Sequence, residues 1–369
     1  MISFENIYKR FGSSVLALAA SVLGLACLSS CSIFDRYEAD EPERDARGMV
    51  DISFYIGNDG ASTKATGILA SNESAVNSWA LLLVQSGSST VFKAMTSEGA
   101  SAISVSVPAG NYTAYAVVNY PTAGNGAFTP SDGMSVSALT GTVSYLENNS
   151  LANLVMFGSK DVSLTSSGSQ SIPVSRLVAK LGIKKISVDF SDPSLAGKAF
   201  VIKGIYVTNA YLTSTLGADY SAAALNAGTA YWQNRMGFQS SSALNPLLAE
   251  TGLTIPVTAG ASYTTEHYFY CYPNQVLSTA DDRNMSAWSK RCTRMVIEAT
   301  VGGTTCYYPI TVANASKGII RNNTYIADEV IIQKMGYADP EGNGPAVLQT
   351  NWSVYAAPWD NGGTINETS

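Results

Sequence analysis

Short runs in which hydrophobic and polar residues alternate recur along most of this chain. The clearest run is MVDISFYI, residues 49–56, in which Val50, Ile52, Phe54 and Ile56 fall on one face. Alternation with a period of two is typical of a β-strand that is buried on one side. We therefore expect a half-buried strand here, with these four side chains facing a core.

Further strand-like runs follow, each bounded by Gly, Asn, Ser or Pro. WALLLV at 79–84 is hydrophobic throughout, which predicts a strand buried on both faces. Residues 103–121 contain two predicted strands around a Pro-Ala-Gly-Asn turn, and 295–312 contain a hairpin whose Gly302-Gly303 pair fits a two-residue turn. Similar runs occupy residues 155–164, 180–190, 200–212 and 266–273.

The same alternation marks AVLQTNWSVYA, residues 346–356, near the C-terminus. Its more apolar face carries five side chains, those of Leu348, Thr350, Trp352, Val354 and Ala356. An isolated strand leaves backbone groups unpaired, so this segment either completes the sheet of its own domain or adds to an exposed edge of another molecule. The pattern alone leaves both alternatives open.

Helical periodicity is limited to patches such as 218–228 and 241–252, so the coarse prediction is an all-β fold with small helical inserts. The length of 369 residues exceeds the roughly 100–200 residues of a typical domain, which predicts two domains. A polar stretch at 167–177 separates two strand-rich halves, and we place the boundary at Arg176. The expected segments are residues 49–175, 176–345 and a C-terminal piece at 346–369.

Composition narrows the class of protein. Only 14% of the residues are charged, hydrophobic residues reach 46%, and there are 20 tyrosines, which is typical of a sheet-rich extracytoplasmic protein. The net charge is −6 and no cluster of Lys and Arg interrupts it. Nucleic acid is therefore not an expected partner.

The N-terminal residues indicate export. Lys9 and Arg10 precede an apolar run at 15–26, as in a secretory signal. LSSC at 28–31 resembles the lipobox of a bacterial lipoprotein, so we expect residues 1–30 to be a signal peptide and Cys31 to be lipidated. Cys27 is a weaker candidate, and an ordinary signal that ends near residue 26 is the alternative.

An acidic tether is expected after the lipid anchor. Residues 32–48 carry six acids and three arginines with few apolar side chains, which is typical of a solvated linker. With Cys31 this gives a tether of residues 31–48. No later apolar run approaches the roughly 20 residues that span a bilayer, so the lipid is the expected membrane anchor.

Catalytic signatures are missing. A Ser-His-Asp site would have to use the single histidine, His267, which no GxSxG motif accompanies. Cys271 lies on the same predicted strand face, but roughly 13 Å away at about 3.3 Å per residue. A lone strand histidine is more often structural, so no enzyme is predicted. A secreted hydrolase that uses His267 is a distant alternative.

Signals for cofactors and metals are weak. GNGAFT at 124–129 fails the dinucleotide fingerprint. Residues 339–344, DPEGNG, resemble the start of a calcium loop, but Thr350 stands where the loop needs Glu, so we expect a solvated turn. We expect no cofactor and no metal.

Three cysteines lie in the body of the chain, an odd number: Cys271, Cys292 and Cys306. The predicted hairpin register places Cys306 opposite about Ala299, so the hairpin does not join Cys306 to Cys292. Buried thiols and one disulfide bridge stay open as alternatives.

Several segments together resemble the fimbrillin family, the subunits of type V pili of Bacteroidales. No single motif is highly specific, but the order and spacing match from the lipobox to the C-terminus. The segments are VPAGNYTAYAVVNYP (107–121), SRLVAKLGIKKI (175–186), CYYPI (306–310), IIRNNTYIADEVII (319–332), a Gly-Tyr-x-x-Pro turn (336–340) and the terminal Asn-Trp strand.

The resemblance implies two tandem transthyretin-like, Ig-like β-sandwich domains in a palmitate-bearing outer-membrane lipoprotein. A surface trypsin-like protease would then remove the first strand, and the C-terminal segment of an incoming subunit would fill the groove. Carried onto this chain, the strand containing Val50, Ile52, Phe54 and Ile56 is lost, 57–67 is the processing loop, and 346–369 is the donor. The implied partners are copies of the chain, other fimbrial subunits and a host or bacterial receptor.

The chain departs from the family at the processing loop. The family usually offers Arg there, whereas the only basic residue here is Lys64, so the expected cut is Lys64-Ala65. Arg44 and Arg47 precede the first strand, and cutting there would free the lipid without opening the groove. A non-polymerising anchor or accessory subunit is therefore one alternative. A surface glycan-binding lipoprotein is another, with Tyr355 and Trp359 as candidate sugar-stacking residues.

Overall fold

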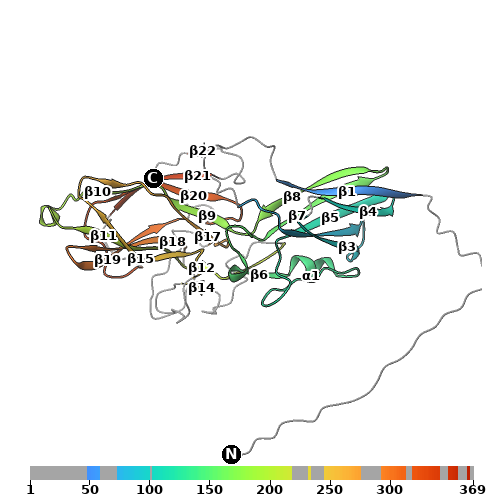
Figure 1. Ribbon diagram of the computed structural model, residues 1–369, viewed down its shortest axis with the longest axis horizontal. Helices are drawn as coiled ribbons and strands as arrows, with labels where there is room; N and C mark the ends of the chain where they lie inside the picture. The colour runs from blue at the N-terminus through green and yellow to red at the C-terminus, as the bar shows by residue number, and fades with distance from the viewer. Residues whose placement is uncertain are drawn as a thin grey trace, which may run out of the picture. The chain divides into compact units, whose positions relative to one another are not determined.

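The regular secondary structure of the described residues is almost entirely β-strand (Figure 1). The computed structural model describes residues 48–58, 73–99, 102–217, 232–233, 245–275, 292–312, 318–340, 348–355 and 364–365. Within these ranges there is one α-helix, α1 (Val136–Thr140), and there are two 3-10 helices, η1 (Leu146–Asn148) and η2 (Pro193–Leu195). The all-β prediction is confirmed.

The first sheet is built by strands from the N-terminal half of the chain in the order β3-β2-β5-β7-β8-β1-β4. β7 and β8 pair only at Met156–Arg176 and Phe157–Ser175, and the sheet turns there into two layers, β3-β2-β5-β7 and β8-β1-β4. The strands are β1 (Met49–Asn58), β2 (Ser78–Gln85), β3 (Val91–Glu98), β4 (Ala102–Pro108), β5 (Gly110–Val118), β7 (Met156–Leu164) and β8 (Gly168–Arg176).

The continuous hydrophobic run at 79–84 lies in β2, which packs against a core on each of its two faces. Trp79, Leu81 and Leu83 face the core between the two layers. Ala80 and Leu82 face the other way, into a second and larger hydrophobic cluster that continues through the C-terminal half. The expected burial of both strand faces is confirmed.

The C-terminal half forms two further sheets. One has the path β16-β10-β20-β21-β22, with β9 also beside β20 and β17 beside β9, and the other has the order β15-β11-β18-β19. The first comprises β9 (Ala179–Ile183), β10 (Ile186–Val188), β16 (Ser262–Tyr263), β17 (His267–Cys271), β20 (Thr324–Ile332), β21 (Leu348–Tyr355) and β22 (Thr364–Ile365). The second comprises β11 (Phe200–Thr208), β15 (Ala249–Val257), β18 (Arg294–Val301) and β19 (Thr304–Thr311).

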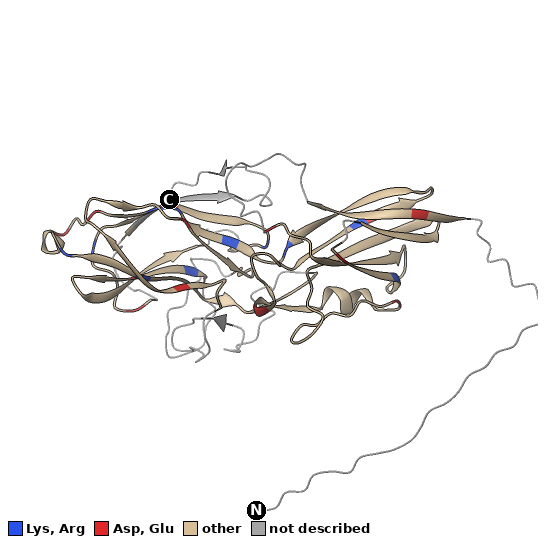
Figure 2. Ribbon diagram, viewed as in Figure 1, with Lys and Arg blue, Asp and Glu red and all other residues tan. Residues whose placement is uncertain are grey.

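Short pairings complete the described structure. β6 (Val143–Tyr145) pairs with β13 (Thr213–Thr215), which joins segments from the two halves of the sequence. β12 (Ala210–Tyr211) pairs with β14 (Trp232–Gln233). All the described residues belong to one compact unit. Charged residues are few and are scattered over its strands and loops, as the composition predicts (Figure 2).

The change from the first sheet to the next falls between Arg176 and Ala179. The polar stretch at 167–177 is largely strand β8 rather than a linker, because its backbone pairs with β1. Its buried side chains Ile172 and Val174 alternate with Ser171, Pro173 and Ser175, which are exposed or half-buried. The domain limits therefore stay a proposal, now set next to a strand end.

The helix expected at 241–252 is wrong for its described part. Asn245 starts a turn in which its Oδ1 accepts from the Leu247 backbone N at 2.8 Å. The residues that follow form β15 and pair with β11, so tertiary pairing overrides the weak helical periodicity. The other patch, 218–228, lies outside the described residues.

The predicted hairpin is confirmed. Gly302 and Gly303 connect β18 to β19 with φ of 58° and 88°, values that fit a two-residue type I′ turn. Cys306 lies opposite Ala299, as expected. Cys271, Cys292 and Cys306 are all buried thiols, so the disulfide alternative is wrong for these three.

Candidate functional site

β1 is the middle strand of its layer. It runs antiparallel to β4, with Phe54 opposite Ile103, and parallel to β8, with Ile52 opposite Gly168. The first strand of the described chain is thus enclosed between two strands that come later in the sequence. Both edges of β1 are paired with backbone.

The inward face of β1 is deeply buried. Val50, Ile52 and Phe54 are 6%, 2% and 0% exposed and belong to the core between the two layers. Ile56 is partly buried and packs against the same core. On the outward face Tyr55 is 41% exposed. The half-buried strand predicted from the alternation is confirmed.

Polar contacts and one close approach hold β1 in register. The backbone N of Asp51 donates to Ser167 Oγ at 3.1 Å, and the hydroxyls of Ser53 and Ser104 lie 2.8 Å apart. Gly57 lies against Ser171, where an added Cβ would come within 2.2 Å of the Ser171 Oγ. β1 therefore extends past the start of the loop predicted at 57–67 and includes Gly57.

Removal of β1 would leave a groove that is one strand wide. Neighbouring strands lie about 4.8 Å apart, so β4 and β8 would face each other across roughly twice that distance with unpaired backbone edges. The floor of the groove would be the apolar core that Val50, Ile52 and Phe54 now cover. Burial of three such side chains is worth on the order of 1.5–3 kcal/mol each, so an empty groove is a strong site for another strand.

The candidate processing and lipidation residues, Cys31, Lys64 and Ala65, lie outside the described residues. The chain is described up to Asn58 at the end of β1 and again from Glu73, a few residues before β2. The stretch with the expected cut therefore lies in sequence between the enclosed strand β1 and the rest of the described chain.

The candidate donor strand pairs with its own sheet. β21 runs antiparallel to β20, with Leu348 opposite Ile332 and Tyr355 opposite Thr324, and the register shifts by one residue near Asp328. On its other side β21 pairs with β22 at only two positions. Leu348 is partly buried against the larger hydrophobic cluster. Of the five candidate donor residues, Ala356 lies outside the described residues, as does Trp359.

His267 has a structural setting. It is 4% exposed, and its Nδ1 lies 2.9 Å from Glu250 Oε2 and its Nε2 lies 3.2 Å from Tyr263 OH. Burial raises the pKa of the Cys271 thiol to about 12, which makes it a poor nucleophile. Within the described ranges, no three His, Cys, Asp or Glu side chains are grouped to hold a metal ion. No helix there is long and apolar enough to cross a membrane.

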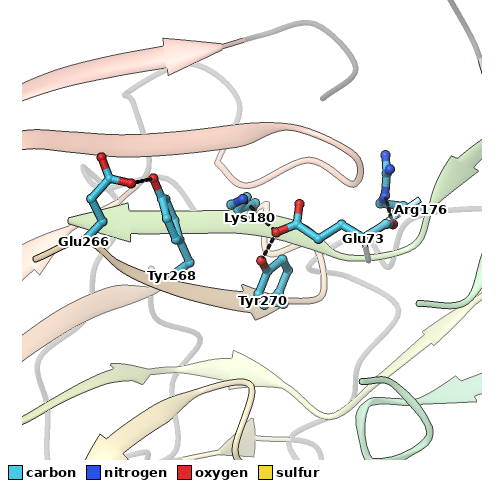
Figure 3. A network of polar contacts seen from close by, with 6 residues as sticks. All are labelled: Glu73, Arg176, Lys180, Glu266, Tyr268 and Tyr270. Carbon is cyan, nitrogen blue, oxygen red and sulfur yellow. Dashed lines mark hydrogen bonds and ion pairs between the residues drawn. The ribbon is translucent and has the colours of Figure 1, made fainter. Parts of the chain in front are cut away.

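A buried ionic cluster was not anticipated from the sequence. Glu73 Oε1 accepts from Lys180 Nζ at 2.8 Å and from the hydroxyl of Tyr270, and both charged side chains are 1% exposed (Figure 3). Burial lowers the pKa of Lys180, although Glu73 acts in the opposite direction. Burial and the bond to Glu73 raise the pKa of Tyr270. The available signal was Lys180 itself, a charge inside the hydrophobic run LVAKLGI.

Comparison with known proteins gives a consistent fold. No family model and no curated protein matches the chain. A fimbrilin from Porphyromonas gingivalis is similar with a TM-score of 0.59 at 16% identity, over 85% of this chain and 98% of that one. A candidate cell adhesion protein from Parabacteroides distasonis has a TM-score of 0.57 at 16% identity, over 83% and 96% of the two chains.

A third structure, of a candidate cell adhesion protein from Bacteroides eggerthii, has a TM-score of 0.56 at 18% identity, over 84% of this chain and 96% of that one. At these identities the likeness concerns the fold, and it extends over most of each chain. The sandwich architecture expected from the resemblance is therefore confirmed. This chain has the fold of the Bacteroidales fimbrillins.

Proposed function

We propose that this protein is a structural subunit of a cell-surface fimbria, a type V pilus, that polymerises by donor-strand exchange and supports adhesion. The enclosed position of β1 carries the proposal. β1 is the first described strand, so one cut between Asn58 and Glu73 would leave it held by non-covalent contacts alone. Its loss would open the groove between β4 and β8 to another strand.

The C-terminal segment has a suitable pattern to fill that groove. Leu348, Thr350, Trp352 and Val354 repeat the two-residue spacing of Val50, Ile52, Phe54 and Ile56. If the donor runs in the direction of β1, Trp352 replaces Phe54, the most deeply buried of the four. A strand with apolar groups at alternate positions binds such a groove through backbone bonds and side-chain pockets together.

The number of strand pairings available to β21 supports exchange into the groove over pairing within its own sheet. In its own sheet β21 has one long neighbour, β20, and a two-residue contact with β22. In the groove it would pair along both edges, with β4 and with β8. Each added backbone bond contributes about 0.5–1.5 kcal/mol net. The second ladder and the buried side chains offset an association cost on the order of 4–15 kcal/mol.

The proposed route to the surface starts with export and lipidation at Cys31. Residues 1–30 would be the signal peptide and 31–48 the tether to the outer membrane. A trypsin-like surface protease would cut Lys64-Ala65, freeing β1 together with the lipid. Other copies of the chain, other fimbrial subunits and a host or bacterial receptor would be the partners. The mechanism is assembly rather than catalysis.

A non-polymerising anchor or accessory subunit is the second candidate. It is favoured by the pairing of β21 with its own β20, which closes that sheet without a partner. It is also favoured by the single basic residue, Lys64, between β1 and Glu73. In this case β1 stays in place and the lipid is retained.

The test is assembly of purified protein that starts at Cys31, after limited trypsin treatment. Three proteins are compared: the unchanged sequence, Lys64→Gln, and a truncation that ends at 345. SDS gels of unboiled samples and electron micrographs measure oligomers.

We expect ladders of SDS-resistant oligomers only from the first protein, because the second keeps β1 and the third has no donor. Cuts at Arg44 and Arg47 provide an internal control, since they free the lipid site but leave β1 in place. Monomers from the unchanged sequence after complete cleavage at Lys64 would contradict polymerisation and favour the anchor subunit.

A further inference from the structure

The connector that leads from the undescribed residues 59–72 into β2 is residues 73–77. It forms no strand or helix, yet buried polar groups hold it at both ends. Between these two points Val76 packs against the core that β1 covers. A connector without regular structure is ordinarily more mobile than the strands it joins, so buried polar contacts at both of its ends are unusual.

The first point of attachment is Glu73. Its carboxylate accepts from Lys180 Nζ at 2.8 Å and from the Tyr270 hydroxyl, and its backbone oxygen accepts from Arg176 Nε at 2.9 Å (Figure 3). The partners come from β9, β17 and the end of β8. All four residues are at most 4% exposed. The connector is thus bound to the sheet of the C-terminal half as well as to its own.

The second point of attachment is Asn119, which follows β5 in the left-handed region with φ of 56°. Its Nδ2 donates to the backbone oxygen of Ala75 at 2.7 Å, and its Oδ1 accepts from the backbone N of Asn77 at 2.9 Å. The Asn77 side chain in turn donates to the Ala152 oxygen at 2.6 Å. Asn119 itself is 1% exposed, and its two bonds to the connector are partly buried.

A buried ion pair is weak evidence for stability in itself, because desolvation offsets the attraction of the charges. Loss of one partner is nevertheless costly, since it leaves the other charge buried and uncompensated. Glu73 therefore has a strong preference for one position over any detached one. Such a contact would hold residue 73 in place even when the chain is cut before it.

We propose that Glu73, Lys180, Arg176, Tyr270 and Asn119 form a retention clamp that stops loss of chain from the N-terminal side at Glu73. When the chain is cut before the clamp, β1 can leave while β2 keeps its place beside β5 and β3. The groove then opens by one strand and no further. The use of the clamp in assembly rests on the proposed function, whereas the retention itself is a property of the monomer.

The test is limited digestion of the full chain with a non-specific protease, with the N-terminal ends of the products identified by mass spectrometry. The variant is Lys180→Met, which leaves Glu73 without its ion-pair partner. The matched control is Lys184→Met, four residues along, which removes a partly exposed pair with Asp328 at 2.9 Å.

We expect the unchanged protein and Lys184→Met to give stable products that begin before or at Glu73. Lys180→Met should lose residues 73–77 and continue to be shortened into β2. In hydrogen exchange of uncut protein, the amides of Asn77 and Ser78 should exchange at least about tenfold faster in Lys180→Met than in the control. Equal end points and equal exchange in the two variants would overturn the clamp.

Glu73→Gln serves if Lys180→Met does not fold. It keeps the size of the side chain and an oxygen for Tyr270 but removes the charge, and it should also exchange faster at Asn77 and Ser78. These measurements use monomers before any assembly. Retention with no polymerisation would contradict the proposed function alone, and polymerisation with unchanged end points in the variants would contradict the clamp alone.

Discussion

Phe54 lies opposite Ile103 where β1 meets β4, and both side chains are buried in the core between the two layers. The strand that the proposed mechanism discards thus contributes one of the largest fully buried side chains of the protein. The uncut protein should depend on β1 for stability. The same residue therefore offers a direct test of how much β1 contributes.

Phe54→Ala should lower the free energy of unfolding of the uncut protein by about 3–5 kcal/mol, because it removes a buried ring and leaves a cavity. Its neighbour Tyr55 is 41% exposed and provides the matched control, with an expected change within about 0.5 kcal/mol. Urea denaturation followed by tryptophan fluorescence measures both. A similar loss from the two variants would show that β1 is not packed as described.

The opened groove should accept a free donor peptide. A synthetic peptide of residues 346–356 should bind the protein cut at Lys64 and truncated at 345, and should not bind the same protein uncut, where β1 fills the site. Replacing Trp352 by Asp in the peptide should weaken binding at least about a hundredfold, because it sets a charge against an apolar floor. Fluorescence anisotropy gives both affinities. Equal binding to cut and uncut protein would exclude the groove as the site.

The close approach of β7 to β8, next to their short pairing, should require glycine at 158. A Cβ at Gly158 would come within 1.8 Å of the backbone oxygen of Pro173, so Gly158→Ala forces the two strands apart. We expect a loss of roughly 1–3 kcal/mol or more in the free energy of unfolding. Gly168→Ala in β8 is the control, because nothing lies within 4 Å of its added Cβ. Thermal unfolding of the two variants should separate them clearly.

The buried thiol of Cys271 should make the fold sensitive to alkali. Burial raises its pKa from the usual 9.0 to about 12 in the folded protein, so folding favours the protonated thiol. The resulting stability is complete below pH 9 and is lost as the pH rises toward 12. Cys271→Ser should flatten this part of the pH profile, measured by urea unfolding between pH 8 and pH 11.

The same burial should block chemical labelling. At pH 8 iodoacetamide should modify Cys271 in urea-unfolded protein but leave it unmodified in folded protein, as peptide mapping would show. Rapid labelling of Cys271 in the folded state would contradict its burial.

Strands could be predicted from the sequence where apolar residues alternate with polar ones and the apolar face packs on a single core. Val50, Ile52 and Phe54 alternate and are buried as expected, and the Gly302-Gly303 turn follows from local backbone preference. The pattern at 241–252 misled because a short apolar patch is compatible with either helix or strand. There the pairing with β11 made the choice.

The sequence predicted the strands of the candidate site but not how they pair. Periodicity and the resemblance to fimbrillins identified β1 and β21 as strands. The neighbours of these strands could not be predicted in this way. β1 pairs with β8, which lies more than a hundred residues later in the sequence, and no local rule predicts such a pairing. Lys180 stood out in the sequence as a charge inside a hydrophobic run, but its partner Glu73 could not be found for the same reason, since Glu73 is 107 residues from Lys180 and 197 from Tyr270.

The sequence by itself determined the all-β class, the inward faces of the strands and the hairpin turn, because these depend on side-chain alternation and local backbone geometry. Only the tertiary structure decided that β1 is enclosed between β4 and β8, that β21 pairs with β20, and that Lys180 is matched by Glu73. Strand order and buried charge pairs are choices among many long-range contacts of similar local quality. The packing of the whole chain selects among them.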